Sequence, residues 1–583
     1  MNICRMRPFA AALIASAAVG IGLAGCGGGD DSDNANLVRT TQFGQIEGVA
    51  NADAKTTAWL GVPFAKPPTG KLRWQPPQDL DAWTGVKATK DYADACPQIG
   101  GLFGPAPKGK DYSAVWETFY KPIGSEDCLY LNIWAPSTGA DKLPVIVYIH
   151  GGSNVVGAAF DPIYEGSNLA VNANAVIVTV AYRLGLMGWF AHPALNTGDA
   201  VRDSGNFALL DLIQSLKFVK DNIANFGGDP ANVTIMGQSA GSTNVNALIL
   251  SPMAAGLFHK AVSMSGGAGG SSMTAAVNKS NAIINALLIK DKLATDKASA
   301  DAYRAAQSND WIRNYLMTKT ATDLYGIQVD PTGGKFGTGS RTFEPGSATA
   351  TLWGTVAPIT DGTVMPANVT TAIRNGTFNK VPQLIGNTSE EGKLFSSAFK
   401  VDDYTRVKWM NGTFLGTTTN LKLEDVVDAS IVTPLTVENY NAYTFNNPNR
   451  ISPAPSITTA GFLGLSNATN AAYYGQVPLY AYNFKWNEQP APWNDVYGAW
   501  HTEDIPFFFG NFNMSLEAFG WSEANRPGRL ALSDVMQKSL AAFIRTGDPN
   551  NSALGVTWDA WTPTAPSRVV FDATLEKAAI SKE

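Results

Sequence analysis

The fold is decided by residues 226–241, FGGDPANVTIMGQSAG. This stretch runs from an apolar segment, residues 233–236, through a G-x-S-x-G turn centred on Ser239 and into the helix-forming residues 242–250. A sharp, glycine-flanked turn between a strand and a helix lifts a serine hydroxyl above the edge of an α/β sheet, where it can act as a nucleophile. The stretch therefore predicts Ser239 as a nucleophile; a glycine-rich turn with a capping serine is the alternative.

Apolar runs and amphipathic segments alternate around this turn. Buried strands are predicted at residues 143–149, 175–181, 233–236, 261–264 and 381–385, and a helix at 207–226. The alternation predicts an α/β fold with a mainly parallel sheet covered by helices on both faces. Residues 270–345 interrupt it and are expected to form a helical insertion over the carboxyl edge of the sheet, where pockets form. Because no linker is evident, residues 38–583 are expected to form one catalytic domain.

The composition excludes several classes of protein. The 583 residues include 45% hydrophobic and 16% charged residues, so the chain can bury a large core and is not a disordered tail. Acidic residues outnumber basic ones, 49 to 43, and no nucleic-acid partner is expected. No cluster of His, Cys and carboxylates has the spacing of a metal site, so neither a metal nor another cofactor is expected.

Residues 1–25 have the pattern of a signal peptide. Arg5 and Arg7 precede an apolar run, residues 9–23, that is too short to span a bilayer comfortably. We therefore expect residues 1–25 to be removed during export.

Cys26 ends the sequence Leu-Ala-Gly-Cys, which is similar to a bacterial lipoprotein box. We expect Cys26 to be lipidated and residues 26–37 to form a flexible, polar tether to a membrane. By resemblance to lipoprotein sorting, Gly27 favours the outer membrane of a Gram-negative bacterium, on its periplasmic or surface face. An ordinary secretory peptide with an incidental cysteine is the alternative.

Two of the four cysteines remain for the folded domain. Cys4 leaves with the signal peptide and Cys26 carries lipid, which leaves Cys96 and Cys128, 32 positions apart. In an oxidising compartment these two are expected to form a disulfide. Two free buried thiols are the alternative.

Ser239 needs a base and an acid. The sequence has four histidines, His150, His192, His259 and His501. The chain order nucleophile, acid, base favours His501 as the base, because it lies far downstream. A loop histidine that packs beside its neighbouring tryptophan is the alternative.

The acid is expected between Ser239 and His501, at the end of a strand. Glu390 and Glu391 follow the predicted strand at 381–386, and the residues alone do not choose between them. Asp361 is a more distant third candidate, and a pair of merely solvated surface carboxylates is the alternative.

A histidine and two glycines, residues 150–152, follow the predicted strand at 143–149. In this position the backbone N–H of Gly152 and the N–H of Ala240 can face a developing oxyanion. A plain Gly-Gly turn is the alternative.

From about residue 44 to residue 572, the chain resembles the type B carboxylesterase and cholinesterase family of α/β-hydrolases. Residues 226–241 are similar to the family's serine signature. Four further blocks carry the resemblance: GVPFAKPPTGKLRWQPP (61–77), EDCLYLNIW (126–134), LIGNTSEEGKLF (384–395) and GAWHTEDIPFFFG (498–510).

The resemblance implies a catalytic triad and its surroundings. The family's acid stands directly before a glycine, which selects Glu391 over Glu390 as the partner of His501 and Ser239. Backbone N–H groups of Gly152, Ser153 and Ala240 would form the oxyanion hole, and the hydroxyl of Ser265 would steady the acid. It also implies the disulfide Cys96–Cys128 and two buried ion pairs, Arg73 with Glu126 and Arg183 with Asp211.

Two departures from the family concern the pocket. Gln238 stands where the family often has Glu, so a negative charge is missing from the site floor and cationic substrates such as choline esters are less expected. Ser153 and Asn154 stand where Gly or Ala and then an aromatic residue are common, which makes the pocket wall more polar.

The resemblance implies that the chain hydrolyses carboxylic esters, small or polymeric, through an acyl-enzyme. The alternatives are a specialised hydrolase of bulky, polymeric or aryl esters, cleavage of carbamates or amides by the same residues, and a non-catalytic binding or adhesion module on the same fold.

Overall fold

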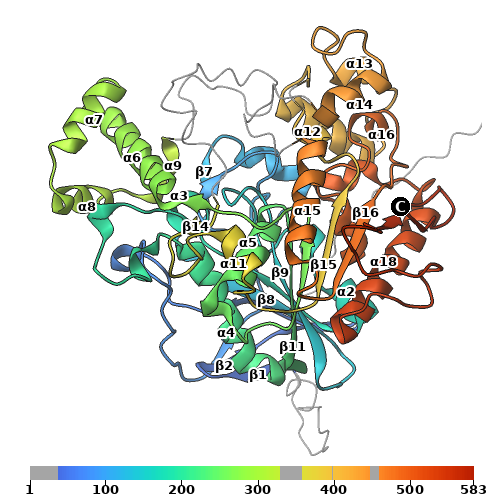
Figure 1. Cartoon of the computed structure of the whole chain (residues 1–583), viewed down its shortest axis with the longest axis horizontal. Coiled ribbons are helices and arrows are strands. Elements are labelled where there is room, and N and C mark those ends of the chain that lie inside the picture. Colours follow the sequence, from blue (N-terminus) through green and yellow to red (C-terminus); the bar gives the residue numbers. More distant parts are fainter. Residues whose placement is uncertain (1–36, 328–356, 397, 447–457) are drawn as a thin grey trace, which may run out of the picture.

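The computed structural model describes residues 37–327, 357–396, 398–446 and 458–583 (Figure 1). Its largest sheet has 11 strands in the order β18-β17-β16-β15-β12-β11-β9-β10-β8-β4-β3. These strands are β3 (Val49–Asn51), β4 (Thr56–Pro63), β8 (Tyr130–Pro136), β9 (Leu143–Ile149), β10 (Val176–Val180), β11 (Gly228–Gln238), β12 (Lys260–Met264), β15 (Gln383–Thr388), β16 (Leu479–Phe484), β17 (Val569–Phe571) and β18 (Ser581–Lys582). Smaller sheets pair β1 (Val38–Thr41), β2 (Gly44–Glu47) and β5 (Val86–Ala88), β6 (Gln98–Ile99) with β7 (Pro122–Ile123), and β13 (Ser271–Ser272) with β14 (Ile359–Thr360).

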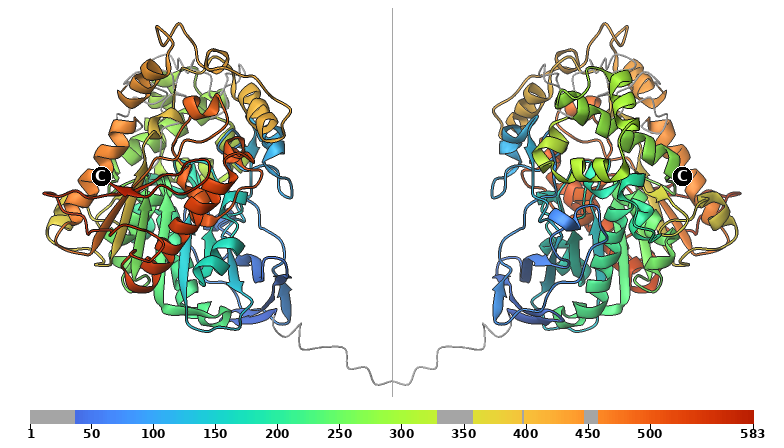
Figure 2. Two further views of the ribbon diagram at one scale, coloured as in Figure 1. Left: turned by 90° about the vertical axis from the view of Figure 1, so that its right-hand side faces the viewer. Right: turned by 90° about the vertical axis from the view of Figure 1, so that its left-hand side faces the viewer.

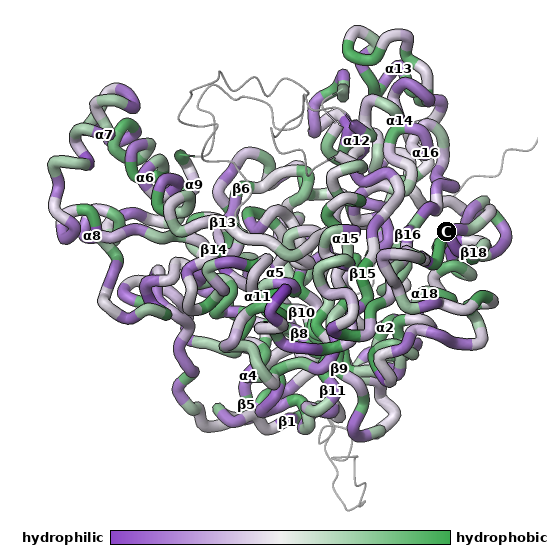
Figure 3. The backbone as a smooth tube through the Cα atoms, viewed as in Figure 1, coloured by the Kyte–Doolittle hydropathy of each residue, from purple (hydrophilic) through white to green (hydrophobic). Residues whose placement is uncertain are grey.

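The middle of the large sheet is parallel, as predicted. Strands β10, β9, β11, β12, β15, β16 and β17 pair in parallel, whereas β8, β4, β3 and β18 join antiparallel at the two edges. Every residue of β9 and β10 is buried, which explains why these strands are uninterrupted apolar runs in the sequence. Figure 3 shows the central strands as hydrophobic.

Side chains alternate between the two faces of the sheet, and those on each face pack into a separate apolar cluster. In β9, Val145, Val147 and Ile149 belong to one cluster, and Ile146 and Tyr148 to the other. The first cluster includes helices α4 and α5, and the second includes α2, α17 and α18. The helices thus cover both faces, which confirms the predicted layers (Figure 2).

The helices of the described residues are as follows: α2 (Ser167–Ala173), α3 (Gly185–Gly188), α4 (Phe207–Asn222), α5 (Ala240–Leu250), α6 (Met273–Lys290), α7 (Lys297–Ala305), α8 (Asn309–Met317), α9 (Ala321–Gly326), α11 (Val369–Arg374), α12 (Asp403–Phe414), α13 (Leu423–Val426), α14 (Val437–Asn446), α15 (Thr459–Tyr473), α16 (Trp493–Val496), α17 (Asp504–Phe509) and α18 (Arg526–Thr546). Among them, no helix combines the length and hydropathy needed to cross a membrane.

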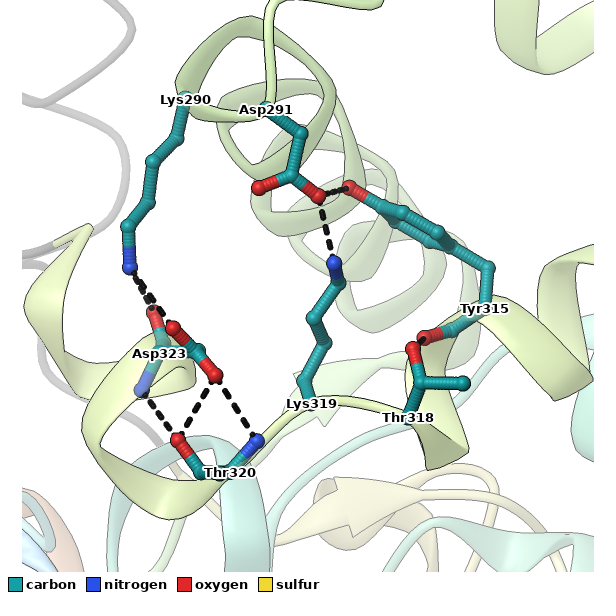
Figure 4. A network of polar contacts seen from close by, with 7 residues as sticks. All are labelled: Lys290, Asp291, Tyr315, Thr318, Lys319, Thr320 and Asp323. Carbon is teal, nitrogen blue, oxygen red and sulfur yellow. Dashed lines mark hydrogen bonds and ion pairs between the residues drawn. The ribbon is translucent and has the colours of Figure 1, made fainter.

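The predicted insertion is helical in its described part. Helices α6 to α9, which we call the arm, project from one side of the molecule (Figure 1), and residues 328–345 lie outside the described residues. The apolar side chains of the arm form one cluster with body residues such as Trp74, Met187 and Phe190, and this cluster is distinct from the two clusters on the sheet. At its base, the Asp291 carboxylate accepts hydrogen bonds from the Tyr315 hydroxyl (2.7 Å) and the Lys319 ammonium (2.5 Å), as Figure 4 shows. The arm joins the body where the Arg73 guanidinium donates to the Lys319 carbonyl (2.6 Å).

Several links that the resemblance implied are present. Cys96 and Cys128 form a disulfide, which confirms that prediction. Both ion pairs are confirmed as well: Arg73 with Glu126 (2.5 Å) and Arg183 with Asp211 (2.7 Å). The predicted signal peptide, Cys26 and almost all of the tether lie outside the described residues.

Candidate functional site

Ser239 occupies a strained turn between β11 and α5. Its backbone has φ 58° and ψ −123°, a conformation that costs energy for a residue with a Cβ atom. The turn is held because the Ser239 N–H donates to the Met264 carbonyl (2.8 Å). A Cβ atom on Gly241 would lie 2.0 Å from the Ile149 carbonyl oxygen, so only glycine fits behind the turn. Ser239 is half-buried, whereas Gln238 and Ala240 on either side are buried, so the turn presents Ser239 alone.

His501 and Glu391 meet across two loops. The Nδ1 atom of His501 donates a hydrogen bond to Oε2 of Glu391, and both side chains are buried. The other carboxylate oxygen, Oε1, accepts the Thr388 N–H (2.8 Å) at the end of β15. Glu391 is thereby the carboxylate that contacts the histidine, in agreement with the choice that the resemblance made over Glu390.

Asp361, the third candidate for the acid, has a structural role in its own turn. Its carboxylate accepts the N–H groups of Thr363 (3.0 Å), Val364 (2.9 Å) and Met365 (2.9 Å). It also accepts the Asn206 amide (2.9 Å). Asp361 therefore closes its own turn and contacts no histidine.

The second ring nitrogen of His501 faces the floor of the site. Its Nε2 atom lies 3.2 Å from Nε2 of Gln238, the residue before Ser239. With Nδ1–H donated to Glu391, Nε2 is the accepting nitrogen, and the Gln238 amide donates to it. Among the described residues, no hydrogen bond joins Ser239 to His501. The rings of Phe395 and Phe462 lie 5.2 Å and 4.6 Å from the imidazole and shield it.

The other three histidines have structural partners. His150 stacks on the Tyr182 ring at 4.6 Å, and burial lowers its pKa to about 4. Nδ1 of His192 accepts the Ala194 N–H (3.0 Å) and begins a short helical turn. Nδ1 of His259 accepts the N–H of Val233 (3.1 Å) in β11. None of these three contacts with the fold involves Ser239.

The loop after β9 lies against the serine turn. A Cβ atom on Gly151 would lie 3.1 Å from the Ser239 Cβ atom. Gly152 has φ +94°, and Ser153 has φ 56°, so both adopt the left-handed conformation. Within the described part of the chain, the N–H groups of Gly152, Ser153 and Ala240 donate to no acceptor. They are therefore free to bind a ligand oxygen, and their role as an oxyanion hole stays a prediction.

Ser265 does not make the contact that the resemblance implied. Its side chain is buried and its N–H donates to the Gly386 carbonyl (2.8 Å), but its hydroxyl has no hydrogen-bond partner among the described residues. In this structure the Thr388 N–H, not Ser265, holds the carboxylate of Glu391.

Buried carboxyl groups behind His501 were missed in the sequence. Asp504 accepts the Tyr482 hydroxyl (2.6 Å); burial raises its pKa to about 7, and the charge of Glu391 adds to the rise. Burial, with a further contribution from Asp161, raises the pKa of Glu517 to about 8. The run Glu503-Asp504, two and three positions after His501, was the available signal. In the described ranges, no group of three or more His, Cys, Asp and Glu side chains could hold a metal ion.

Comparisons with known proteins match one family over nearly the whole chain. The model of the carboxylesterase family matches residues 34–582. The para-nitrobenzyl esterase of Bacillus subtilis (strain 168) is 29% identical over 549 residues, which cover 92% of this chain and 95% of the relative. The acylcarnitine hydrolase of Mus musculus is 31% identical over 551 residues, with 90% and 86% covered. A solved structure of PNB esterase has a TM-score of 0.67 at 28% identity and covers 94% of this chain and 97% of its own.

Proposed function

Since this chain belongs to the carboxylesterase family and is a carboxylic ester hydrolase, we propose that Ser239, His501 and Glu391 perform the hydrolysis as a triad. The observation that carries the proposal is the hydrogen bond from His501 to the buried Glu391, with the accepting nitrogen of the imidazole turned toward the residue beside Ser239. A neutral imidazole held in this tautomer can take a proton from a serine hydroxyl.

The proposed reaction has two halves. In the first, the Ser239 hydroxyl oxygen attacks the ester carbonyl while Nε2 of His501 takes its proton, and the amide of Gln238 gives way to the serine at that nitrogen. Collapse of the tetrahedral adduct breaks the ester C–O bond, and His501 returns the proton to the departing alcohol. In the second half, a water molecule loses a proton to His501, attacks the acyl carbonyl and releases the acid, and Ser239 recovers its proton.

The negative oxygen of each tetrahedral adduct would lie in the loop after β9. The N–H groups of Gly152, Ser153 and Ala240 are the proposed donors, because their positions beside the serine turn leave them unpaired within the described residues. One such donor contributes about 3–4 kcal/mol to the transition state in other enzymes.

We propose neutral esters as the substrates. The residue before Ser239 is the uncharged Gln238, and the rings of Phe395 and Phe462 flank the histidine, so these three side chains offer a substrate neutral and apolar surface and no negative charge. The name of one relative, para-nitrobenzyl esterase, supports benzyl esters as a specialised class to test beside the aryl esters. The membership in an esterase family disfavours the non-catalytic binding module.

We also propose that the enzyme is exported and anchored through a lipid on Cys26, to the outer membrane of a Gram-negative bacterium. The support is the lipoprotein box followed by the polar residues 27–36. Labelling with palmitate in cells is expected to mark the wild type and not Cys26→Ala. Equal labelling of both chains would refute the anchor.

The test of the triad is hydrolysis of the p-nitrophenyl esters of acetate, butyrate and octanoate by the full-length chain in detergent. Ser239→Ala is expected to abolish turnover, whereas Ser137→Ala, at an exposed serine after β8, is expected to retain it. A folded wild type no faster than Ser239→Ala on every ester would overturn the proposal.

A further inference from the structure

Two consecutive glutamates reach the same loop. Glu391 binds His501, and Glu390 binds Ala499, two residues earlier. The Ala499 N–H donates to Oε2 of Glu390 (2.8 Å), and the N–H of Glu390 donates to the Ala499 carbonyl (2.9 Å). The loop that carries the imidazole is therefore tied to the acid turn by both backbone polar groups of Ala499.

The carboxylate of Glu390 lies directly against the backbone of this loop. Gly498 has φ +53°, and a Cβ atom built on it would lie 1.8 Å from Oε2 of Glu390. Glycine is therefore required at this position, because any side chain would push the carboxylate away from Ala499. In this close fit the loop contacts Oε2 of Glu390 through the Ala499 N–H.

The other oxygen of Glu390 is bound by Lys393. The Lys393 ammonium lies 2.5 Å from Oε1 of Glu390, and only 2% of the Lys393 side chain is exposed. The same ammonium lies 6.0 Å from the centre of the Tyr440 ring, on α14. A buried lysine of this kind is stable only beside its carboxylate. The ion pair therefore fixes the rotamer of Glu390 and directs its other oxygen, Oε2, to the Ala499 N–H.

We infer that Glu390, oriented by Lys393, is a positioning residue that sets the place of His501 and thereby determines kcat. The inference rests on the proposed function, since it assigns a purpose to a group that does not touch the reacting atoms. A displacement of about 1 Å at a catalytic group can cost about 100-fold in rate. Without the tie at Ala499, the imidazole would keep its bond to Glu391 but lose the fixed distance to Ser239.

Two double variants separate the tie to Ala499 from the buried charge. Glu390→Gln with Lys393→Met keeps an oxygen that can accept the Ala499 N–H, whereas Glu390→Met with Lys393→Met removes it. Both lack the ion pair, and Gln and Met have similar shapes. Glu438→Gln, at an exposed carboxylate of α14, is the matched control.

The measurement is kcat and KM for p-nitrophenyl butyrate with the full-length chain, together with a thermal melt of each variant. We expect the Gln/Met variant to keep kcat within about threefold of the wild type, and the Met/Met variant to lose about 100-fold in kcat with KM changed by less than about threefold. Should the Met/Met variant fail to fold, Glu390→Ala with Lys393→Met provides the same comparison.

Each result either supports or overturns the role of Glu390. Equal kcat in the two double variants overturns the inference, whether both match the wild type or both are slow, because the Ala499 acceptor would then be irrelevant. A loss that falls on KM instead of kcat also overturns it. A wild type no faster than Ser239→Ala would refute the proposed function itself and this inference with it, so the two failures are distinguishable.

Discussion

Replacing Glu517 by Gln is expected to stabilise the protein at alkaline pH and to leave its stability at pH 4.5 nearly unchanged. Glu517 is buried, its Oε2 accepts the Ser515 hydroxyl (2.8 Å), and its Oε1 accepts the hydroxyl of Thr502 (3.2 Å), the neighbour of His501. Burial first, and then the charge of Asp161, raises the pKa of Glu517 to about 8. Glutamine has the shape of the neutral acid, keeps one accepting oxygen, presents an N–H donor where the neutral acid presents O–H, and does not ionise.

The size of the effect follows from proton linkage. In the unfolded chain the carboxyl has its ordinary value of 4.5, and in the fold its pKa is about 8. Because the folded state holds the proton more tightly, the contribution of Glu517 to stability is complete below pH 4.5 and is lost as pH rises through 8. At about 1.4 kcal/mol per pH unit, the loss is at most about 5 kcal/mol. The free energy of unfolding of Glu517→Gln does not fall in this way, because glutamine does not ionise.

Urea unfolding followed by tryptophan fluorescence, at pH 5 and pH 9, measures the effect. We expect the free energy of unfolding of Glu517→Gln to exceed that of the wild type by several kcal/mol at pH 9 and by little at pH 5. Glu576→Gln, at an exposed carboxylate, is the control and should match the wild type at both pH values. A difference between Glu517→Gln and the wild type that is the same at pH 5 and pH 9 would refute the reasoning.

Two further substitutions test the oxyanion loop and the disulfide. Gly152→Ala adds a Cβ atom that would lie 2.1 Å from the Val156 carbonyl oxygen, at a backbone φ of +94°. The displaced N–H donor should lower kcat by about 100- to 1,000-fold. Ester kinetics measure this, and a kcat within twofold of the wild type would contradict it. Replacing both Cys96 and Cys128 by Ala should lower the free energy of unfolding by about 3–4 kcal/mol, because the bond closes a long loop; urea unfolding checks this, and a loss below about 1 kcal/mol would count against it.

The parallel core of the fold could be predicted because its signal is local. Strands β9 and β10 are buried on both faces, so their sequences are continuous apolar runs, and the serine turn combines a strand, two glycines and a helix in one short stretch. The antiparallel strands β4 and β8 were not predicted. Their pairing joins residues far apart in the chain, for example Trp59 and Ile133, and no single stretch carries that information.

The choice of acid lay beyond the residues alone. Glu390 and Glu391 are neighbours, and which of them points at His501 depends on the backbone of the turn after β15. Only the resemblance, through the glycine that follows, favoured Glu391. Lys393 shows the same limit, because a lysine is usually exposed and its burial depends on the partner oxygen of Glu390.

The contact between Gln238 and His501 joins residues 263 positions apart and has no signature in either segment. The two residues meet because the parallel sheet brings the turn after β11 and the loop after β16 to one edge. Sequence analysis found both ends of this contact as candidates, but their distance is a property of the assembled sheet.

The separate apolar cluster of the arm has a consequence for how the molecule opens. Since the side chains of α6 to α9 pack with one another and with residues around Met187 and Phe190, and not with the two clusters on the sheet, loosening of the arm need not disturb the strands that carry Ser239. In native-state hydrogen exchange, the amides of the arm are expected to exchange together as one cooperative unit, at a lower free energy than those of β9 and β11. The strand that ends at Ser239 would then lie in the slowest-exchanging layer, whereas the arm would open without it.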